Sequence, residues 1–388
     1  MYSAKPRFPQ PLRQKQTPSS LTSVENDTYE VQRMIFQGPS KPLLNQIDHL
    51  SLSPRPGETL VQITMSTICG SDLHTFEGRR DGTPPSVLGH EGVGIVIATG
   101  PGANDSLIGK RVTWTLVDTC GCCEPCTSWD LPQKCDNLFK YGHSSVTVGQ
   151  GLNGCFASHI MLRKGTHIVP LPDALSDVEA VPANCALATM VAVVDPLLKG
   201  QRTPRKVLIQ GAGLLGIYGA TLLKNAGVKN VYVTDVFPGR LDLAQNFGSK
   251  TIDSSDLNTI RDGSFDAIIE VAGNSVIIPE GLRVLRPGGT YVWAGMVHDE
   301  TPLDFLGVDI VRGCATIIGV HNYAPRHLEE GIQFLTRNAD QFPWNQLVSS
   351  PLKLSQLNEA FELAQTRKWH RVSVIPDYAE FVTKPPPN

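Results

Sequence analysis

The sequence has little excess charge of either sign. Its 34 lysines and arginines stand against 37 acidic residues, which gives a formal net charge of −3 over 388 residues. This balance excludes a nucleic-acid binder that works through a basic surface. Because apolar residues make up 41% of the chain, the sequence is also unlike a disordered chain of low hydrophobicity. At about 150 residues per domain, we expect two or three folded domains.

Long hydrophobic runs are scarce. No apolar stretch of about 18 residues is uninterrupted, so the sequence predicts no transmembrane helix. The nearest candidate, 207–223, contains a glutamine and four glycines and is better explained as a strand, a turn and a helix. The N-terminus has no apolar core typical of a secretory signal. We therefore expect a cytoplasmic protein with a basic, disordered extension over 1–26, and an organellar transit peptide is the alternative.

Cysteines are also few, but they are clustered. Nine cysteines do not make a disulfide scaffold in a chain of this length. Three of them are spaced as CxxCxxC, and a fourth follows after eight residues. Four thiolates at about 2.3 Å form a tetrahedral zinc site, and short CxxC turns bring them together. The spacing predicts a closed structural zinc site in a polar lobe over 118–140, with incidental reduced cysteines as the alternative. The expected ligands are Cys120, Cys123, Cys126 and Cys135, and Cys122 falls outside this register.

Two patterns of secondary structure divide the chain. From Tyr29 to about Pro172, β-branched and alternating runs are broken by turn pairs, which predicts strands. Beyond Asp177, short apolar runs alternate with helical stretches, and this rhythm predicts an α/β fold with a doubly wound parallel sheet. We expect strands at 58–68, 92–98, 111–117, 156–162, 207–210, 231–235, 267–271, 291–294, 316–320 and 371–375, and helices at 214–225, 240–247, 279–285, 327–336 and 354–367.

An apolar strand at 206–210 leads directly into a glycine-rich turn that opens a helix. Such a turn lets the backbone approach a pyrophosphate, and the helix N-terminus offers N–H groups to it. A packing turn that binds nothing is the alternative, but the strand before and the helix after favour a dinucleotide site. The residues of this GxGxxG turn that we expect at the cofactor are Gly211, Gly213, Leu214, Leu215 and Gly216.

An acidic residue follows this turn at a suitable distance. Asp235 lies 19 residues after Gly216, at the end of the next predicted strand. Its carboxylate would accept hydrogen bonds from the adenosine ribose hydroxyls and repel a 2′-phosphate. We therefore predict NAD as the cofactor. NADP is less favoured, but Arg240, five residues further on, is placed to meet a 2′-phosphate.

Three further residues are candidates for a second metal site. Cys69, His90 and Cys185 are far apart in the sequence, so spacing cannot join them. Each also has a simple structural explanation, as a buried thiol or as a histidine that caps a turn. The residues alone leave both interpretations open.

These motifs occur together in an order typical of one family. The sequence resembles the zinc-dependent medium-chain alcohol dehydrogenases over about 29–376, because it carries in order CGSDLH at 69–74, GHE at 89–91, the cysteine lobe, Cys185 and the glycine-rich turn. The resemblance implies hydride transfer between NAD and an alcohol, which would be a secondary alcohol, a polyol or a substituted primary alcohol. It also implies a GroES-like catalytic domain over 27–185, a Rossmann domain over 186–322 and a segment, 323–388, that returns to the catalytic domain.

The resemblance also assigns roles at the second metal site. Cys69, His90 and Cys185 would hold a catalytic zinc, so that the chain would bind two zinc ions, and the fourth position would take water or substrate. Glu91 would approach the metal during ligand exchange, and Asp72 would orient the histidine ligand.

Further roles follow from the same resemblance. Ser71 would accept the alcohol proton and His74 would relay it to solvent. The edge strand at 316–320 would pair across a homodimer or homotetramer. The eight residues between the third and fourth cysteines of the lobe are one more than the family usually has, which predicts either a slight displacement of Cys135 or a bulged loop. The nicotinamide would lie near two loops, one containing Val271 and Gly273 and the other spanning Ala294–Met296.

A closer likeness concerns the substrate. The stretches 131–135, 139–143 and 181–185 resemble a branch of alcohol dehydrogenases associated with phosphonate catabolism. A phosphonate-bearing alcohol needs a cationic clamp near the metal. The available side chains are Arg79, Arg80, Lys140 and His143, for which solvated loop charges are the alternative explanation.

Three other functions share parts of this pattern. A zinc-free quinone or enoyl-type reductase has the same fold but would not need Cys69, His90 and Cys185. A non-enzymatic nucleotide-binding protein would not need Ser71 and His74. A dithiol redox protein would need a free cysteine pair, which four thiolates on zinc do not leave. The remaining cysteines lie in strand-like runs and are expected to be buried apolar residues, namely Cys155 and Cys314.

Overall fold

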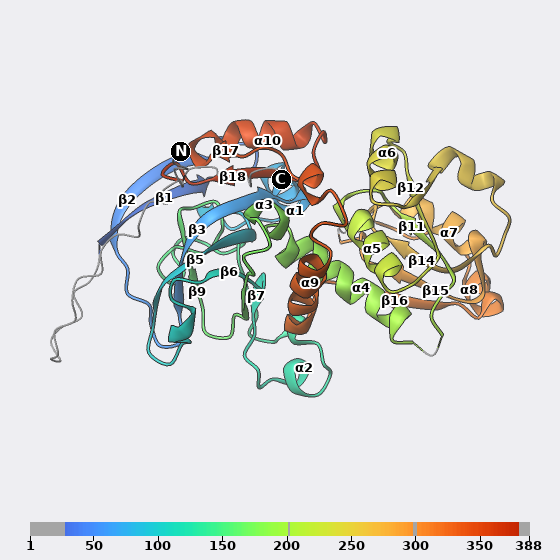
Figure 1. Ribbon diagram of the computed structural model, residues 1–388, viewed down its shortest axis with the longest axis horizontal. Helices are drawn as coiled ribbons and strands as arrows, with labels where there is room; N and C mark the ends of the chain where they lie inside the picture. Colours follow the sequence, from blue (N-terminus) through green and yellow to red (C-terminus); the bar gives the residue numbers. More distant parts are fainter. Residues whose placement is uncertain (1–27, 201, 298–300, 380–388) are drawn as a thin grey trace, which may run out of the picture.

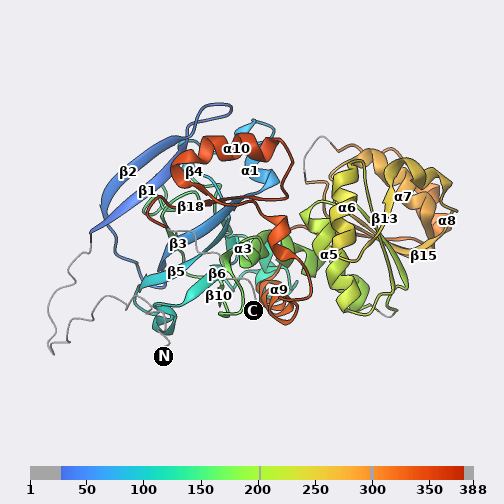
Figure 2. The same ribbon diagram turned by 45° about the horizontal axis from the view of Figure 1, so that its top comes forward.

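The computed structural model describes residues 28–200, 202–297 and 301–379. The extension expected at 1–26 lies outside these residues. A β-rich half and an α/β half lie side by side, and helix α4 (Ala188–Leu198) crosses between them (Figures 1 and 2). The combination of a strand-rich half with a helix-flanked parallel sheet confirms the predicted α/β class.

Three sheets build the β-rich half. The largest has the strand order β10-β6-β5-β3-β18-β17, and β9 also pairs with β3. A second sheet has the order β2-β1-β4, and a third is the pair β7-β8. The strands are β1 (Thr28–Phe36), β2 (Leu44–Ser51), β3 (Thr59–Ile68), β4 (Ser86–Val87), β5 (Glu91–Thr99), β6 (Arg111–Trp114), β7 (Val117–Asp118), β8 (Phe139–Lys140), β9 (His159–Leu162), β10 (Ile168–Pro170), β17 (Leu352–Lys353) and β18 (Val372–Ile375).

The two long central strands of this half follow the prediction. β3 and β5 differ from the predicted 58–68 and 92–98 by no more than one residue at either end. Nearly every side chain of β3 is buried, because separate apolar clusters contain Ile63 and Ile68. A strand buried this completely keeps a continuous apolar signal in the sequence.

Shorter strands were predicted less well. The strand expected at 111–117 ends at Trp114, because the Leu116 N–H donates to the Tyr323 hydroxyl instead of continuing the sheet. The strand expected at 156–162 begins only at His159. Of the described strands in this half, β1, β2, β4, β8, β10 and β17 were not predicted, and the strand at Lys250–Asp253 in the other half was not predicted either.

The α/β half is one parallel sheet of six strands in the order β13-β12-β11-β14-β15-β16. This is the order of a doubly wound dinucleotide-binding sheet, in which the ligand crevice lies where the strand order reverses, beyond β11. The strands are β11 (Lys206–Gln210), β12 (Asn230–Asp235), β13 (Lys250–Asp253), β14 (Phe265–Glu270), β15 (Leu285–Trp293) and β16 (Thr316–Gly319), and the helices are α5 (Leu214–Asn225), α6 (Pro238–Asn246), α7 (Ile278–Val284) and α8 (Gly307–Gly313).

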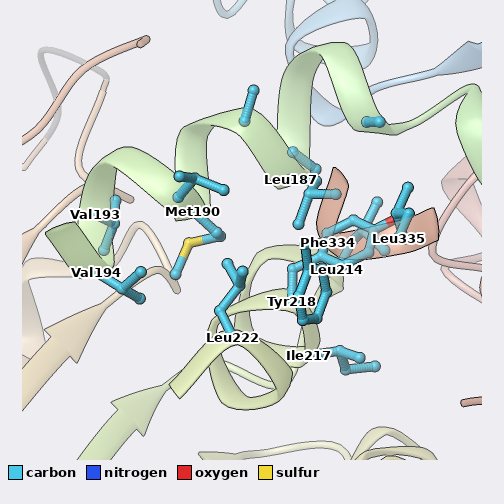
Figure 3. Close-up of a cluster of buried hydrophobic side chains, with 14 of the residues drawn as sticks. Leu187, Met190, Val193, Val194, Leu214, Ile217, Tyr218, Leu222, Phe334 and Leu335 are labelled. Atoms are coloured by element: carbon cyan, nitrogen blue, oxygen red, sulfur yellow. The ribbon is translucent and has the colours of Figure 1, made fainter. Parts of the chain in front are cut away.

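A helical core joins the two halves. Figure 3 shows Met190 of α4 above Leu214, Tyr218 and Leu222 of α5, with Leu335 of α9 (Pro325–Arg337) beside them. These side chains belong to one buried apolar cluster. Burying apolar surface against both halves fixes α4 as their common element.

One helical segment in the described part of the chain is long and apolar enough to cross a membrane. It runs over Asp177–Leu198, and 67% of its apolar window is buried inside the protein. The stretch 207–223 is instead a strand, a turn and a helix, as the sequence predicts. Burial of the window against α5 and α9 accounts for the apolar character of the segment.

The C-terminal segment lies against the β-rich half. β18 pairs antiparallel with β3, and β17 pairs with β18. The helix predicted at 354–367 begins as a 3-10 turn, continues as α10 (Leu357–Gln365) and stops before Arg367, which has a left-handed backbone (φ 57°). The other short helices are α1 (Gly70–Phe76), α2 (Glu124–Thr127), α3 (Asp177–Ala180) and 3-10 turns at Asp105–Leu107, Pro132–Lys134, Ser254–Thr259, Ser275–Ile277 and Trp344–Leu347.

The two leftover cysteines differ in their surroundings. Cys155 is fully buried, as expected. The same prediction is wrong for Cys314, which is exposed and ends α8 with a left-handed backbone (φ 46°). Its apolar neighbours before it belong to the exposed helix α8, and those after it belong to β16, in which no residue is fully buried.

Candidate metal and cofactor sites

Four side chains from three distant segments converge in the β-rich half. One donor atom from each of Cys69, His90, Glu91 and Cys185 lies within 4.8 Å of the others. Cys69 precedes α1, His90 and Glu91 stand at the start of β5, and Cys185 lies on a π-helical turn, Ala183–Leu187. Single π-helical turns are rare and are frequently found at functional sites.

Asp72 links two of these segments. Its Oδ2 accepts the Cys69 N–H at 2.9 Å, and its Oδ1 accepts the Gly89 N–H at 3.2 Å. The same Oδ1 lies 3.4 Å from His90 Nδ1. The carboxylate therefore faces Nδ1, which leaves Nε2 of the imidazole for a metal.

Asn184 fixes the third segment. Its buried side-chain amide donates to the His90 and Trp114 carbonyls, both at 3.0 Å. The Tyr323 hydroxyl donates to the Asn184 carbonyl. These bonds place the next residue, Cys185, beside His90. The sequence gave no sign of Asn184, because an asparagine before a single cysteine belongs to no motif of fixed spacing.

The sequence also gave no sign of Arg371, which holds Glu91. The guanidinium donates to both carboxylate oxygens, at 2.7 and 2.8 Å, and Thr67 donates to one of them at 2.5 Å. Arg371 also lies 3.5 Å from the Cys69 sulfur. In this structure both carboxylate oxygens of Glu91 are thus bound to an arginine, which leaves Cys69, His90 and Cys185 as the other three donors of the cluster.

Burial and neighbouring charges shift the pKa values of these groups. The Cys185 thiol donates to the Cys69 sulfur, and with the nearby Arg371 this holds the pKa of Cys69 well below its ordinary value despite burial. The same bond and burial raise the pKa of Cys185. Burial lowers the pKa of His90, but Asp72 more than compensates and raises it to about 10. Burial raises the pKa of Glu91 against the opposing charge of Arg371.

The donor set fits zinc. Two thiolates and an imidazole are the ligands that catalytic zinc takes in alcohol dehydrogenase, with an open fourth position for water or substrate. Oxygen-preferring cations such as magnesium would find one carboxylate here, and that carboxylate is already paired with Arg371.

Two polar side chains of α1 adjoin this cluster. Ser71 Oγ lies 3.5 Å from His90 Nε2, on the side of the ring that a metal would occupy. His74 is three residues further on, where Arg79 lies 3.2 Å from its Nε2. Because a guanidinium only donates, Nε2 accepts and the ring proton sits on Nδ1.

The cysteine lobe forms the second cluster. The Cys123 sulfur lies 3.3 Å from that of Cys126 and 3.8 Å from that of Cys135. A tetrahedron of sulfurs around zinc has edges of about 3.8 Å. The N–H groups of Cys122 and Cys123 lower the pKa of Cys120 to about 5, which favours its thiolate. All four predicted sulfurs lie within 4.8 Å of one another, and Cys122 is outside the group.

The long loop of the lobe is accommodated locally. The 3-10 turn Pro132–Lys134 takes up the extra length before Cys135. The Cys120 N–H then donates to the Cys135 sulfur at 3.2 Å. The loop therefore does not displace Cys135, although the added residue suggested a bulge there.

The glycine-rich turn has the shape of a phosphate cradle. A Cβ on Gly216 would stand 1.9 Å from the Gly211 carbonyl oxygen, so the helix can approach the strand only with glycine there. In front of Gly213 there is open space, and this glycine precedes the first turn of α5. The Leu214 side chain is buried in the core and that of Leu215 is half-buried. Backbone N–H groups are thus what this turn offers to a ligand.

Asp235 ends β12 beside this turn. Its carboxylate accepts the Ala212 N–H at 2.8 Å and the Phe237 N–H at 3.0 Å. Arg240 Nη1 lies 3.8 Å from the same carboxylate. Burial and the charge of Arg367 lower the pKa of Arg240, and Asp235 opposes them.

The carboxyl ends of two further strands complete the crevice. Val271 and Gly273 follow β14, and Glu270 accepts the Gly273 N–H at 2.6 Å. Ala294 and Met296 follow β15 and line a cavity of about 770 Å³. The Rossmann sheet therefore directs these residues toward the ligand crevice.

The four basic residues singled out from the sequence have different partners. Arg79 is paired with Glu77 and His74. Burial and the charge of Arg80 lower the pKa of Lys140 to about 8, while the Cys185 and Cys69 sulfurs and Asp72 oppose this. The His143 ring stacks on His90 with centroids 5.8 Å apart. Burial lowers the pKa of His143, and Lys140 and His90 lower it further.

Comparison with known proteins decides the family. Residues 55–173 match the alcohol dehydrogenase GroES-like domain and 195–369 the glucose dehydrogenase C-terminus. The chain is 30% identical over 270 residues to an L-threonine 3-dehydrogenase of Legionella pneumophila. This alignment covers 64% of this chain and 73% of that protein. The chain belongs to the zinc-dependent medium-chain alcohol dehydrogenases. The predicted family and enzyme class are thereby confirmed, with a GroES-like part and a Rossmann part.

Other members of the alcohol dehydrogenase family align over most of their length. An L-threonine 3-dehydrogenase of Thermococcus kodakarensis is 26% identical, over 83% of this chain and 92% of that protein. The 5-exo-hydroxycamphor dehydrogenase of Pseudomonas putida is 27% identical, over 80% and 90%.

Solved alcohol dehydrogenases share the fold. One from Thermotoga maritima has a TM-score of 0.82 and 28% identity, covering 90% of this chain and all of that one. A dehydrogenase from Escherichia coli in complex with NADH has a TM-score of 0.76 and 25% identity, covering 89% and 100%. The family therefore implies zinc and a nicotinamide cofactor for this alcohol dehydrogenase.

Proposed function

We propose that this alcohol dehydrogenase oxidises a secondary alcohol, a polyol or a substituted primary alcohol with NAD, at a zinc held by Cys69, His90 and Cys185. The observation that carries the proposal is the convergence of these three donors within 4.8 Å. They come from segments that otherwise share no sequence motif, and Asp72 and Asn184 bind the segments together.

Chemistry at this site needs a proton acceptor beside the substrate hydroxyl. When bound, zinc supplies Lewis-acid chemistry toward that hydroxyl. Ser71 is the side chain placed to take the hydroxyl proton, because its Oγ is 3.5 Å from His90 Nε2. His74, on the same helix, is placed to pass the proton to solvent. Glu91 stays paired with Arg371 and acts on the sulfur and imidazole ligands through its charge.

NAD is the proposed cofactor, although the wider family includes proteins crystallised with NADH and with NADP. Asp235 supports NAD because its carboxylate is held beside the glycine-rich turn by the Ala212 N–H. A 2′-phosphate would meet this negative charge before it could reach Arg240, which Asp235 already neutralises at 3.8 Å.

We also propose two zinc ions per chain, the second in the cysteine lobe. The test of the whole assignment is metal analysis of the purified enzyme combined with an alcohol panel assayed with NAD⁺ and with NADP⁺. We expect two zinc ions per chain and higher kcat/KM with NAD⁺. One zinc ion per chain, or turnover that survives removal of all zinc by a chelator, would contradict the proposal.

A phosphonate-bearing alcohol is a second candidate substrate. It is supported by Lys140, a half-buried cation whose charge interacts with both thiol donors and with Arg80. Such a buried cation is costly unless an anion joins it. The test compares kcat/KM for a hydroxyalkylphosphonate and for its uncharged alcohol analogue, and equal values for the two would remove this candidate.

A homo-oligomer is proposed from the edge of the α/β half. β16 is the last strand of its sheet, and the adjacent α8 region carries exposed Leu306 and Val311. An unpaired sheet edge with apolar side chains is a typical subunit contact. Light scattering should give the mass of a dimer or tetramer, and a monomer at micromolar concentration would contradict this.

A further inference from the structure

The cysteine lobe contains one thiol more than a closed zinc site takes. Four of its sulfurs lie within 4.8 Å of one another, and that of Cys122 is not among them. A structural zinc is bound by four ligands. Cys122 therefore keeps a free thiol when the lobe is loaded, and this residue is exposed.

The backbone brings Cys122 next to one particular ligand. The chain bends over 121–123, where Gly121 has a left-handed backbone (φ 69°). The N–H groups of Cys122 and Cys123 lie 3.5 and 3.4 Å from the Cys120 sulfur. The Cys122 thiol donates to the same sulfur. Cys120 is thus the ligand that Cys122 contacts through both its backbone and its side chain.

Both residues of this pair are open to solvent. The exposed cysteines of the chain are Cys120, Cys122 and Cys314, whereas the lobe ligand Cys135 is buried. Cysteines that respond to oxidants are solvent-accessible, have thiolate character and stand next to a second thiol that resolves the first oxidation product. A zinc ligand supplies the thiolate, and Cys122 is placed as the resolving thiol. Cys314 differs, because its thiol faces the Val311 carbonyl oxygen at 3.8 Å.

We propose that Cys120 and Cys122 form an oxidation-sensitive pair, which a hydroperoxide converts to a disulfide with loss of the lobe zinc. This inference rests on the lobe zinc of the proposed function and adds a modification site to it. The pair is local to one turn, so the disulfide can form without movement of the two halves of the molecule.

The oxidation balances with one hydroperoxide. The Cys120 thiolate attacks the outer oxygen of the peroxide, the O–O bond breaks, and the other oxygen takes a proton from solvent and leaves as an alcohol or as water. The Cys122 sulfur then attacks the sulfenic sulfur of Cys120. The S–S bond forms, the S–O bond breaks, and the hydroxyl leaves with the thiol proton as water. Two electrons pass from the two sulfurs to the peroxide.

Loss of Cys120 as a ligand affects more than the turn. Three donors of the lobe remain, one fewer than a closed zinc site has. The lobe also contacts the α/β half, because Asp130 pairs with Arg326 at 2.9 Å and Lys134 approaches His321 at 2.6 Å. Release of the lobe metal should therefore loosen these contacts as well.

The test exposes the zinc-loaded wild type to hydrogen peroxide and follows two signals. A chromogenic zinc chelator measures the released metal, and peptide mapping after alkylation identifies the disulfide. We expect a disulfide between Cys120 and Cys122 and release of the lobe zinc, both reversed by dithiothreitol and added zinc. The same measurement in Cys69→Ala, which should hold zinc only in the lobe, assigns the released metal to this site.

Cys122→Ser separates the pair from general oxidation of zinc thiolates. The variant keeps all four donors, and without the resolving thiol it should release the lobe zinc about tenfold more slowly. The matched control is Cys314→Ser, which removes the exposed thiol outside the lobe and should release zinc as fast as the wild type.

Equal release rates in Cys122→Ser and the wild type, or a disulfide that excludes Cys122, would overturn the proposal. Absence of zinc from the lobe before oxidation would instead contradict the proposed function, while peptide mapping would still decide whether the pair forms.

Discussion

The two cysteine-containing clusters of this enzyme are assembled in opposite ways. The lobe takes four sulfurs from one short stretch, Cys120 to Cys135, of which only the last residue is buried. The buried cluster takes Cys69, His90 and Cys185 from three segments that a network of hydrogen bonds already holds. If both clusters bind zinc as proposed, the metal would stand in for a hydrophobic core in the lobe and would enter a site already built by hydrogen bonds in the buried cluster.

Cys69→Ala gives the largest expected effect. Loss of one sulfur ligand should leave one zinc ion per chain, in the lobe, and reduce kcat by about a thousandfold or more, because Lewis-acid stabilisation is worth several kcal/mol. Metal analysis and steady-state kinetics measure both changes. Since the hydrogen-bond network remains, the melting temperature should change little. Full turnover with two zinc ions would show that the assignment is wrong.

Arg371→Met tests the network that holds the buried cluster. The substitution leaves the Glu91 carboxylate buried without its cation, which should cost about 3–5 kcal/mol of unfolding free energy. Denaturant titration measures the loss. The control is Arg326→Met, which breaks the exposed pair with Asp130 and should cost less than about 1 kcal/mol. The double variant Glu91→Gln, Arg371→Met should recover part of the stability, and equal losses in the two single variants would contradict the network.

Cys126→Ser addresses the other cluster. It should release the lobe zinc and retain the buried one. Amide hydrogen exchange should rise within 118–140 but not around His90, because the lobe has no core of its own. We expect a smaller loss of kcat than in Cys69→Ala, because the lobe sulfurs form a group separate from the buried donors. A loss of kcat as large as that of Cys69→Ala would erase the distinction between the clusters.

Lys140→Met gives the smallest expected effect, and it should raise the stability of the protein instead of lowering it. Burial lowers the pKa of Lys140 to about 8 from 10.5, with Arg80 lowering it and the Cys69 and Cys185 sulfurs and Asp72 raising it. The charged form therefore destabilises the fold below about pH 8, and this cost disappears as pH rises toward 10.5. The variant should be more stable at pH 7 by about 1–3 kcal/mol, with the difference shrinking toward pH 10. Thermal unfolding across this pH range tests the prediction.

The same contrast explains what could be predicted from the sequence. The lobe sulfurs and the glycine-rich turn lie in short patterns, so spacing alone selected groups that the structure brings together. Cys69, His90 and Cys185 needed a family resemblance, because no local pattern links them. Arg371 is 280 residues from Glu91, and an arginine before a strand gives no local signal. Lys134 and His321, 187 residues apart, meet only because the two halves are packed together.

Exposure was the other quantity that sequence patterns misjudged. Cys314 lies among apolar residues, yet it caps an exposed helix at the edge of the α/β half. Short apolar runs do not distinguish a buried strand from a surface that a second subunit covers. The predicted strand at 316–320 was correct to within one residue at its end, because its β-branched run remains visible.

Cys185 is anchored from both directions. The amide of Asn184 ties it to the β-rich half, and the helix that follows it, α4, packs on α5 of the α/β half. We therefore expect a rotation of one half against the other to act on this proposed ligand more than on Cys69 or His90, which lie in the β-rich half. If cobalt replaces the zinc proposed at Cys69, His90 and Cys185, its visible absorption spectrum should therefore report a movement of one half against the other.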